Sequence, residues 1–320
     1  QMQKPFIELY RPQVLDEVVG NQQTVQRLKY FIQNGNLPNL LFTSPPGMGK
    51  TTIAHCLGRQ MLKEQFKNAF IELNASDERN VTDIRERVKT FAQLQITLDL
   101  GKHKIVFLDE CDSMTSQAQL ALRRIIEDFS DTTRFILCCN MIQKVVEPLQ
   151  SRCCLITLQP PSIDDIQTRL VQICQKAEIE YTNDALKLLS QLADGDVRNA
   201  VNNLQTVAYS LQKKLTLSGV KDVLDFIDVN QVSQILTLAK QQIANTYPKI
   251  KQLIDEGYSI EEIINAFYRY GQDVTNKMPD TERVRFLKAV AQSHAKIVGG
   301  IIQVYRTIER HFRFCFKNLR

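Results

Sequence analysis

The stretch NLLFTSPPGMGKTT, residues 39–52, decides the fold. It opens with the apolar run Asn39–Thr43, which is typical of a strand buried on both faces of a parallel sheet. A loop rich in glycine and proline follows, and the pattern of Thr51–Leu62 then predicts a helix. The order strand, glycine-containing loop and helix, with Gly-Lys-Thr at the end of the loop, is the spacing of a P-loop.

The loop carries the chemistry of phosphate binding. Gly47 and Gly49 allow the backbone to curl so that successive N–H groups point at phosphate oxygens, and the helix start adds its positive dipole end. We expect Lys50 to reach the β- and γ-phosphates of ATP and the Thr51 hydroxyl to ligate Mg²⁺. The alternative is an ordinary turn, and Ser44 stands where a P-loop usually has glycine. The predicted nucleotide-binding loop comprises Ser44, Pro45, Pro46, Gly47, Met48, Gly49, Lys50, Thr51 and Thr52.

A pair of carboxylates further along the chain complements this loop. The apolar run Lys104–Leu108 predicts a strand that ends in Asp109 and Glu110. Because successive strand residues point to opposite faces, the two carboxylates reach different targets. Asp109 is a candidate Mg²⁺ ligand, and Glu110 is a candidate general base for the attacking water. Such a cluster alone is often a solvated turn, but after a P-loop it predicts a Walker B motif and ATP hydrolysis.

Five apolar runs predict the strands of one sheet. Helical patterns such as Ser116–Asp128 lie between them. Alternation of strands and helices is typical of an α/β fold with an open parallel sheet. The predicted strands are Asn39–Thr43, Ala69–Leu73, Lys104–Leu108, Arg134–Cys139 and Cys154–Leu158.

The strand signal stops after Pro160 and Pro161, and everything beyond is predicted to be helical. Ser162 is the expected N-cap of the first helix there. Breaks at Ala193–Asp196 and Asp225–Asn230 divide the helical part. We therefore predict three domains, which are an α/β ATP-binding domain at residues 1–160, a small helical domain at 161–226 and an all-α domain at 227–320.

Composition excludes several classes of protein. The chain has 320 residues, a formal net charge of +5 and 43% hydrophobic residues, which argues against disorder. No apolar run approaches the roughly 20 residues of a membrane span, and the first residues lack the apolar core of a signal peptide. None of the eight cysteines shows metal-ligand spacing, and the pairs Cys138–Cys139 and Cys153–Cys154 are expected to be buried free thiols. Free thiols in this number suit a reducing compartment inside the cell.

With these motifs, the chain from about Phe6 to at least Ser210 resembles an AAA+ ATPase and, more specifically, the small subunits of the eukaryotic clamp loader, replication factor C. Residues 91–93 and 101–105 look closest to the second small subunit of animals, whereas the last third matches only weakly. The motifs that carry the resemblance are ELYRP (8–12), VGN (19–21), the P-loop, ELNASDER (72–79), LDECD (108–112), TRF (133–135), SRC (151–153) and GDVRNA (195–200).

The resemblance implies an ATPase with a helical lid and a helical collar that joins unlike subunits into a hetero-pentamer. It implies that ATP binding and hydrolysis load a sliding clamp, proliferating cell nuclear antigen, onto primer–template DNA in the nucleus. Two alternatives stay open. One is a structural subunit that binds nucleotide without hydrolysing it, and the other is a different AAA+ remodeller of DNA, such as a branch-migration motor.

The resemblance also implies roles for residues beyond the two motifs. Asn140, after the fourth strand, would be sensor 1, and Arg198 in the lid would be sensor 2. Arg152 would act in trans, as an arginine finger in the site of the neighbouring subunit. From the residues alone, a turn residue is the favoured interpretation of Asn140, and the N-terminal segment could simply be a packing segment. The adenine pocket would be lined by Ile7, Tyr10, Arg11 and Val19.

Basic residues after the ELNASDER motif are candidates for DNA binding. Arg85 and Lys89 are four residues apart and share a helix face. Cations spaced this way meet successive phosphates without reading bases. Asp83 and Glu86 make a solvated helix face an equally good explanation from sequence alone, and the resemblance favours DNA. The predicted DNA contacts are Arg79, Arg85 and Lys89, with Arg123 and Arg124 as weaker candidates.

The helix near Ser113–Asp128 would touch the clamp, by the same resemblance. Its apolar residues either make that contact or face the core. Four residues depart from the family pattern without removing a reacting group, which are Ser44, Phe6, Asn80 and Cys111. The basic and aromatic segment Arg306–Arg320 is expected to be a packed amphipathic helix rather than a DNA contact. The clamp candidates on the first helix are Met114, Leu120, Ile125 and Ile126.

Overall fold

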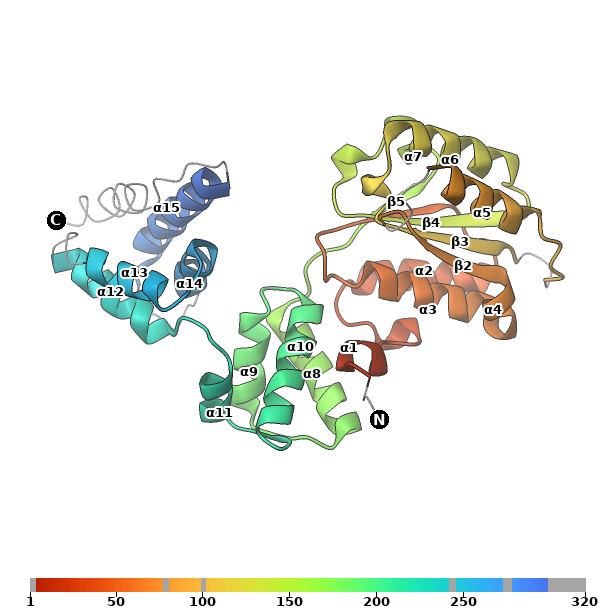
Figure 1. Cartoon of the computed structure of the whole chain (residues 1–320). Helices are drawn as coiled ribbons and strands as arrows, with labels where there is room; N and C mark the ends of the chain where they lie inside the picture. The colour runs from red at the N-terminus through yellow and green to blue at the C-terminus, as the bar shows by residue number, and fades with distance from the viewer. Residues whose placement is uncertain (1–3, 77–80, 99–101, 242–245, 273–277, 299–320) are drawn as a thin grey trace. The chain divides into compact units, whose positions relative to one another are not determined.

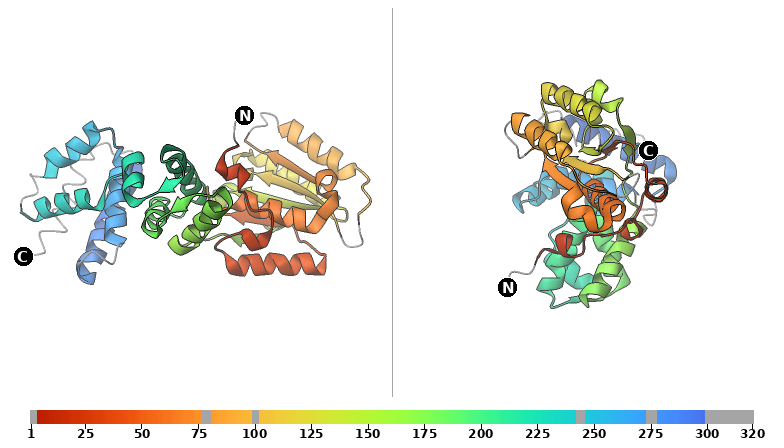
Figure 2. Two further views of the ribbon diagram at one scale, coloured as in Figure 1. Left: turned by 90° about the horizontal axis from the view of Figure 1, so that it is seen from below. Right: turned by 90° about the vertical axis from the view of Figure 1, so that its right-hand side faces the viewer.

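The computed structural model describes residues 4–76, 81–98, 102–241, 246–272 and 278–298 (Figures 1 and 2). The chain divides into two compact units, one up to Leu224 and one from Asp225 onward. The first unit contains both the α/β part and the helices that follow it. The division into three domains at 160 and 226 therefore stays a prediction, with only its second boundary near a break between units.

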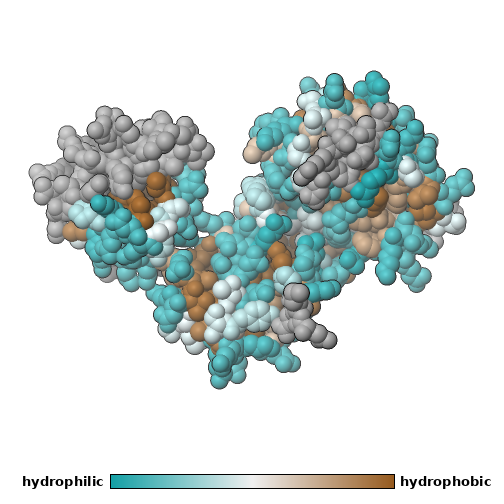
Figure 3. Space-filling model, in the orientation of Figure 1, coloured by the Kyte–Doolittle hydropathy of each residue, from teal (hydrophilic) through white to brown (hydrophobic). Residues whose placement is uncertain are grey.

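Hydrophilic residues predominate on the face of the molecule in Figure 3, where hydrophobic residues form separate patches. Exposed large apolar side chains are scattered along the chain, for example Leu9, Tyr30 and Leu155. Single exposed apolar residues are normal on protein surfaces. Within the described ranges, no helix is both long and apolar enough to cross a membrane.

One five-stranded parallel sheet organises the first unit (Figure 1). The spatial order of its strands is β2-β3-β4-β1-β5. All five predicted strands are confirmed, and each end agrees with the prediction or is shifted by one residue. The strands are β1 (Leu40–Thr43), β2 (Phe70–Asn74), β3 (Lys104–Asp109), β4 (Thr133–Cys139) and β5 (Cys154–Thr157).

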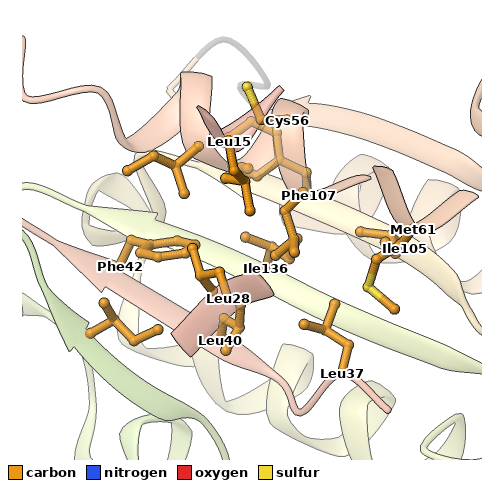
Figure 4. Packing of buried hydrophobic residues seen from close by; sticks show 14 of the residues in the cluster. Leu15, Leu28, Leu37, Leu40, Phe42, Cys56, Met61, Ile105, Phe107 and Ile136 are labelled. Atoms are coloured by element: carbon orange, nitrogen blue, oxygen red, sulfur yellow. The ribbon is translucent and has the colours of Figure 1, made fainter. Parts of the chain in front are cut away.

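Helices cover both faces of this sheet, as an α/β fold requires. Alternate residues of the central strands point to opposite faces, so that each strand supplies two clusters. Phe42 and Ile136 pack with Leu28 on the face of α2 (Gln22–Asn34) and α3 (Lys50–Leu62), as Figure 4 shows. Leu41 and Leu137 pack on the opposite face against α5 (Val81–Gln93) and α6 (Ser116–Asp128). The predicted α/β fold class and the predicted bounds of α6 are confirmed.

Short elements connect these layers. They fill the turns between the strands and the longer helices, and several of them carry residues of the site described below. They are α1 (Phe6–Leu9), η1 (Leu15–Glu17), η2 (Lys63–Gln65), α4 (Phe66–Ala69), η3 (Cys111–Ser113), η4 (Ile142–Lys144) and α7 (Glu147–Gln150).

Four helices complete the first unit. Ser162 caps the first of them in a capping box with Asp165, as expected from the sequence. The prediction that the chain is entirely helical beyond Pro161 is wrong at one place. There, two short parallel strands pair with each other, Glu180–Tyr181 (β6) and Lys214–Leu215 (β7). Strands this short lack the alternating pattern that would reveal them. The helices are α8 (Ile163–Ala177), α9 (Asn183–Leu192), α10 (Val197–Ser210) and α11 (Leu217–Val223).

The second unit is helical over its described residues, in agreement with the predicted all-α domain. Its core joins residues of several helices, including Ile235, Phe267 and Phe286. The segment Arg306–Arg320 lies outside the described residues. The helices are α12 (Val229–Gln241), α13 (Thr246–Asp255), α14 (Ile260–Gln272) and α15 (Asp280–Val298).

The cysteines of the described residues are free thiols. Cys138 and Cys139 are fully buried in β4, as predicted, and burial raises the pKa of Cys138. Cys153 and Cys154 are only half-buried, so the prediction of buried thiols is wrong for this pair. The difference follows from the topology, because β5 is an edge strand and β4 is a central one.

Candidate nucleotide-binding site

The candidate site lies at the carboxyl ends of three neighbouring strands. β1 leads into the P-loop, β4 ends before Asn140, and β3 ends in Asp109. The strand order places β4 between β1 and β3, with Thr43 opposite Cys139 and Leu108 opposite Leu137. Residues far apart in the sequence therefore meet at one edge of the sheet, which is where open α/β sheets bind ligands.

The P-loop backbone requires glycine at two positions. Gly47 has φ +78° and Gly49 has φ +86°, a left-handed conformation that other residues rarely adopt. A Cβ at Gly47 would also lie 2.1 Å from the carboxylate of Asp196, which caps the N-terminus of α10. A Cβ at Gly49 would meet nothing within 4 Å. Gly47 thus serves both the loop conformation and the close approach of the lid.

Ser44, which stands where glycine is usual, is accommodated without strain. It has no left-handed φ, so its backbone conformation is open to any residue. Its side chain is buried, and its hydroxyl donates to the carbonyl of Pro45 at 3.1 Å. The departure from the usual P-loop sequence therefore leaves the loop geometry intact.

Lys50 lies buried at the centre of this edge. Its ammonium group donates to the carbonyls of Ser44 at 2.6 Å and Pro45 at 2.9 Å, and to Oδ1 of Asn140 at 2.8 Å. Burial lowers the pKa of Lys50, and nearby groups including Asp109 oppose that shift. A compact, poorly solvated ammonium group in this position suits a phosphate ligand, which supplies the missing negative charge.

Thr51 and Asp109 bring oxygen atoms together beside Lys50. The Thr51 hydroxyl donates to Asp109 Oδ2 at 2.6 Å, and Asp109 Oδ1 accepts the backbone N–H of Glu110 at 2.9 Å. Mg²⁺ prefers oxygen ligands and is usually held by one or two protein groups together with phosphate oxygens and water. A hydroxyl and a carboxylate next to a phosphate loop fit that requirement.

Glu110 has a left-handed backbone conformation, with φ +54°. Such a conformation in a residue other than glycine costs of order 1–3 kcal/mol and is found mainly at functional sites. Glu110 is half-exposed and lines the same cavity as Lys50 and Thr51. The strained turn thus places Glu110 on the wall of the cavity.

Asp112 is a site residue that the sequence did not single out, although it belongs to the LDECD motif. Its Oδ2 accepts the backbone N–H groups of Asn140 at 3.2 Å and Met141 at 3.0 Å. It therefore holds the turn that presents Asn140 to Lys50. The repeated acidic residue after the strand was the available signal, but its target, the turn after β4, depends on the strand order.

One cavity collects most of the predicted nucleotide-binding residues, with about 1070 Å³ of empty space that includes the part open to solvent. Ser44 and Pro45 do not line it, and their backbone carbonyls accept hydrogen bonds from Lys50. Arg198, on the first turn of α10, lines the same cavity as the P-loop. The predicted residues that line it are Ile7, Tyr10, Arg11, Val19, Pro46, Gly47, Met48, Gly49, Lys50, Thr51, Thr52, Asp109, Glu110, Asn140 and Arg198.

Arg169 also lines the cavity, and the sequence analysis missed it. It is buried in α8, where it donates to the backbone carbonyl of Tyr10 and, at 2.9 Å, to Gln172. Burial lowers the pKa of Arg169, and the charge of Glu17 opposes the shift. A charged residue on the apolar face formed by Ile166 and Ile173 was the signal that could have revealed it.

The N-terminal segment forms the wall of this cavity. Phe6 is buried in the lid core, and its backbone N–H donates to Gln205 of α10 at 2.7 Å. The rings of Phe6 and Tyr10 are edge-on, 5.1 Å apart. The segment therefore packs in the lid core and also lines the cavity, and its contact with adenine stays a prediction.

Arg152 lies apart from this cavity. It is exposed and does not belong to the lining residues. Its Nε and Nη2 atoms each lie 2.7 Å from Oε1 of Glu127 in α6. The structure thus does not place Arg152 at the chain's own nucleotide site.

The predicted DNA contacts are only partly described. Arg79 and Asn80 lie outside the described residues. Arg85 and Lys89 both lie on α5. Lys89 is exposed, whereas the structure does not describe the side chain of Arg85. On α6, Arg124 is exposed and Arg123 binds Glu127 at 3.0 Å.

The apolar residues proposed for clamp contact divide in two groups. Leu120 is 42% exposed on α6, and Met114 is half-buried before it. Ile125 and Ile126 are buried in the core and are not available for contact.

Comparisons with known proteins agree with this arrangement. The model of the AAA family of ATPases matches residues 40–160, and the model of the replication factor C C-terminal domain matches residues 227–303. The solved structure of the Thermotoga maritima RuvB Holliday junction branch migration motor superposes with a TM-score of 0.57 and 19% identity, over 71% of this chain and 80% of that one. At that identity the likeness shows the fold alone.

Curated relatives span nearly the whole chain. Probable replication factor C subunit 2 of Dictyostelium discoideum is 41% identical over 93% of this chain and 88% of the relative. Replication factor C subunit 4 of Saccharomyces cerevisiae is 36% identical, over 94% and 92%. The replication factor C small subunit of Aeropyrum pernix is 38% identical, over 92% and 90%. With its P-loop, its Walker B carboxylates and both family domains, the chain belongs to the AAA ATPases of the replication factor C family.

Proposed function

We propose that this chain is an ATP-hydrolysing subunit of the replication factor C clamp loader. In the nucleus, it would use ATP to load the sliding clamp, proliferating cell nuclear antigen, onto primer–template DNA. The observation that carries the proposal is the convergence of Lys50, Thr51, Asp109 and Asn140 on one cavity that the lid residue Arg198 also lines. Membership of the family supplies the class of reaction.

The P-loop and Lys50 hold the triphosphate. Backbone N–H groups of the loop and the N-terminus of α3 bind phosphate oxygens, and Lys50 exchanges its carbonyl partners for the β- and γ-phosphates. Thr51 and Asp109 would hold Mg²⁺, which neutralises charge on the β- and γ-phosphates when it is bound. The N-terminal wall with Tyr10 and Val19 would accept the adenine.

Glu110 and Asn140 act on the attacking water. Glu110 accepts a proton as the water oxygen bonds to the γ-phosphorus, while the bond from that phosphorus to the bridging oxygen breaks and ADP leaves. Asn140, whose Oδ1 accepts from Lys50, donates through its amide N–H₂ toward the γ-phosphate or the water. Asp112 keeps Asn140 in place through the two backbone hydrogen bonds described above.

Two arginines would complete the site, one within the chain and one between chains. Arg198 reaches the nucleotide from the lid. Arg152 lies outside its own cavity and would enter that of the neighbouring subunit, where a guanidinium stabilises charge on the transferred phosphoryl group. One chain would then hold parts of two sites, in a hetero-pentamer with other replication factor C subunits.

The DNA and clamp contacts would come from α5 and α6, which cover the face of the sheet opposite α2 and α3. Arg79, Arg85 and Lys89 would track DNA phosphates along α5. Leu120, which is exposed on α6, is the best placed of the four apolar candidates for clamp contact. A helix that follows Walker B directly is well placed to join clamp contact to the catalytic residues.

The test uses the assembled complex of this chain with its companion subunits. Adding primed DNA and clamp together should raise the rate of ATP turnover above that of either addition alone. Arg152→Ala should lower this stimulated rate while the chain keeps its own affinity for ATP. A rate that does not respond to DNA and clamp would contradict the proposed function.

A further inference from the structure

Glu127, in the last turn of α6, binds two arginines through one carboxylate oxygen. Arg152 donates from Nε to Oε1 at 2.7 Å, and its Nη2 lies 2.7 Å from the same oxygen as an ion-pair contact. Arg123, one helical turn before Glu127, donates to the same oxygen from Nη2 at 3.0 Å and Nε at 3.2 Å. The hydrogen bond from Arg152 is the main reason why the pKa of Glu127 is lowered, so the carboxylate is charged at neutral pH.

The contact uses one particular edge of the Arg152 guanidinium. A guanidinium carries five N–H groups. Glu127 lies against its side edge, which carries Nε–H and one N–H of Nη2. The contact does not use the end edge, formed by Nη1 and the other N–H of Nη2. That edge offers two parallel N–H groups, which is the geometry that grips a phosphate in a bidentate manner. The same arginine can therefore bind Glu127 and a phosphate together.

The backbone of Arg152 is fixed more firmly than its side chain. The residue follows α7, and its backbone N–H donates to the carbonyl of the buried Leu149 at 3.2 Å. Its side chain is 48% exposed. A long exposed arginine loses much rotational freedom when it is ordered, so an anchor for the guanidinium reduces what remains to be ordered at a neighbouring site.

We propose that Glu127 is a positioning residue for Arg152, which holds the guanidinium by its side edge and leaves the end edge for the γ-phosphate in the neighbouring subunit. Arg123 keeps Glu127 in the required orientation. The inference rests on the proposed action of Arg152 in trans. Exposed ion pairs shift an equilibrium by up to about fivefold. Loss of Glu127 should therefore lower the rate of ATP hydrolysis in the neighbouring subunit less than loss of Arg152 does.

The experiment is a double-mutant cycle in the assembled complex, with clamp and primed DNA present. Arg152→Ala defines the part of the ATP turnover that depends on the arginine. Glu127→Gln should lower that part about three- to fivefold with KM for ATP unchanged, because the contact acts in the transition state. The double variant should match Arg152→Ala alone. Asp128→Asn, the same charge change one residue along on the exposed surface, should leave turnover unchanged.

The possible failures are distinguishable. If Arg152→Ala lowers turnover but Glu127→Gln does not, Glu127 has no positioning role and the proposed function stands. If the two losses multiply in the double variant, Glu127 acts on the fold rather than through Arg152, and the inference is again wrong. If Arg152→Ala leaves turnover unchanged, the proposal that Arg152 acts in trans is wrong, and so is the positioning role of Glu127.

Discussion

Gly47→Ala is the substitution whose cost can be worked out most directly from the structure. The residue has φ +78°, and a left-handed conformation costs an L-residue roughly 1–2 kcal/mol. A Cβ there would also overlap the Asp196 carboxylate at 2.1 Å, so that this side chain must shift and its cap of α10 is disturbed. Gly49→Ala has the same conformational cost at φ +86° but meets nothing within 4 Å. Gly49→Ala is therefore the matched control, which isolates the clash.

The assay is the thermal midpoint of the full chain together with its affinity for ATP. For a domain of about 150–250 residues, each kcal/mol lowers the midpoint by roughly 2–4 °C. Gly49→Ala should thus lower it by about 2–8 °C, and Gly47→Ala should lower it further and weaken ATP binding more. Asp196→Gly removes the clashing carboxylate, and glycine replaces a capping aspartate at a cost of only a few tenths of a kcal/mol.

In the Asp196→Gly background, Gly47→Ala and Gly49→Ala should therefore become equal in their effects. The reasoning is refuted if the two alanine variants are already equal in the wild-type chain. It is refuted as well if Asp196→Gly leaves the difference between them unchanged.

Three further predictions concern single contacts of the site. Thr51→Val removes the hydroxyl that binds Asp109 and should lower Mg²⁺-dependent ATP turnover by about 10–100-fold. The measurement is the turnover rate as a function of Mg²⁺ concentration, and a curve identical to that of wild type would contradict the prediction. Asp112→Asn weakens two charge-assisted hydrogen bonds to the turn at Asn140 and should destabilise the chain by about 1 kcal/mol, with a lower kcat and little change in KM. Equal effects on KM and kcat would argue against that positioning role. Hydrogen bonds from the Gln13 backbone and from Lys176 lower the pKa of Glu17, so its contribution to stability is complete above pH 4.5 and is lost as the pH falls through the lowered value. The thermal midpoints of wild type and Glu17→Gln should therefore differ at neutral pH and converge in acid, and a constant difference would contradict the assignment.

The sheet and the phosphate loop could be predicted because their signals are local. Each central strand is an apolar run buried on both faces, and the P-loop sequence specifies both its turn and its ligand. The same is true of the Ser162 cap, whose partner Asp165 is three residues away.

The contacts that could not be predicted join elements far apart in the chain. Arg169 reaches the Tyr10 carbonyl across 159 residues, and Asp112 reaches Asn140 only because β3 and β4 are neighbours. The short pair β6–β7 depends on packing of the helices around it. The side chain of Arg152 meets Glu127 through the packing of α7 on α6, which no spacing in the sequence encodes.

The most direct test of the account is Glu110→Gln in the assembled complex. Glutamine preserves the size of the side chain but cannot accept the proton of the attacking water. The account predicts that this chain still binds ATP with wild-type affinity and no longer hydrolyses it, measured as nucleotide retained by this subunit after a single turnover of the complex. If the subunit converts its ATP to ADP at the wild-type rate, Glu110 is not the base. If neither wild type nor variant converts it, the chain is a nucleotide-binding structural subunit, and the proposed hydrolysis is contradicted.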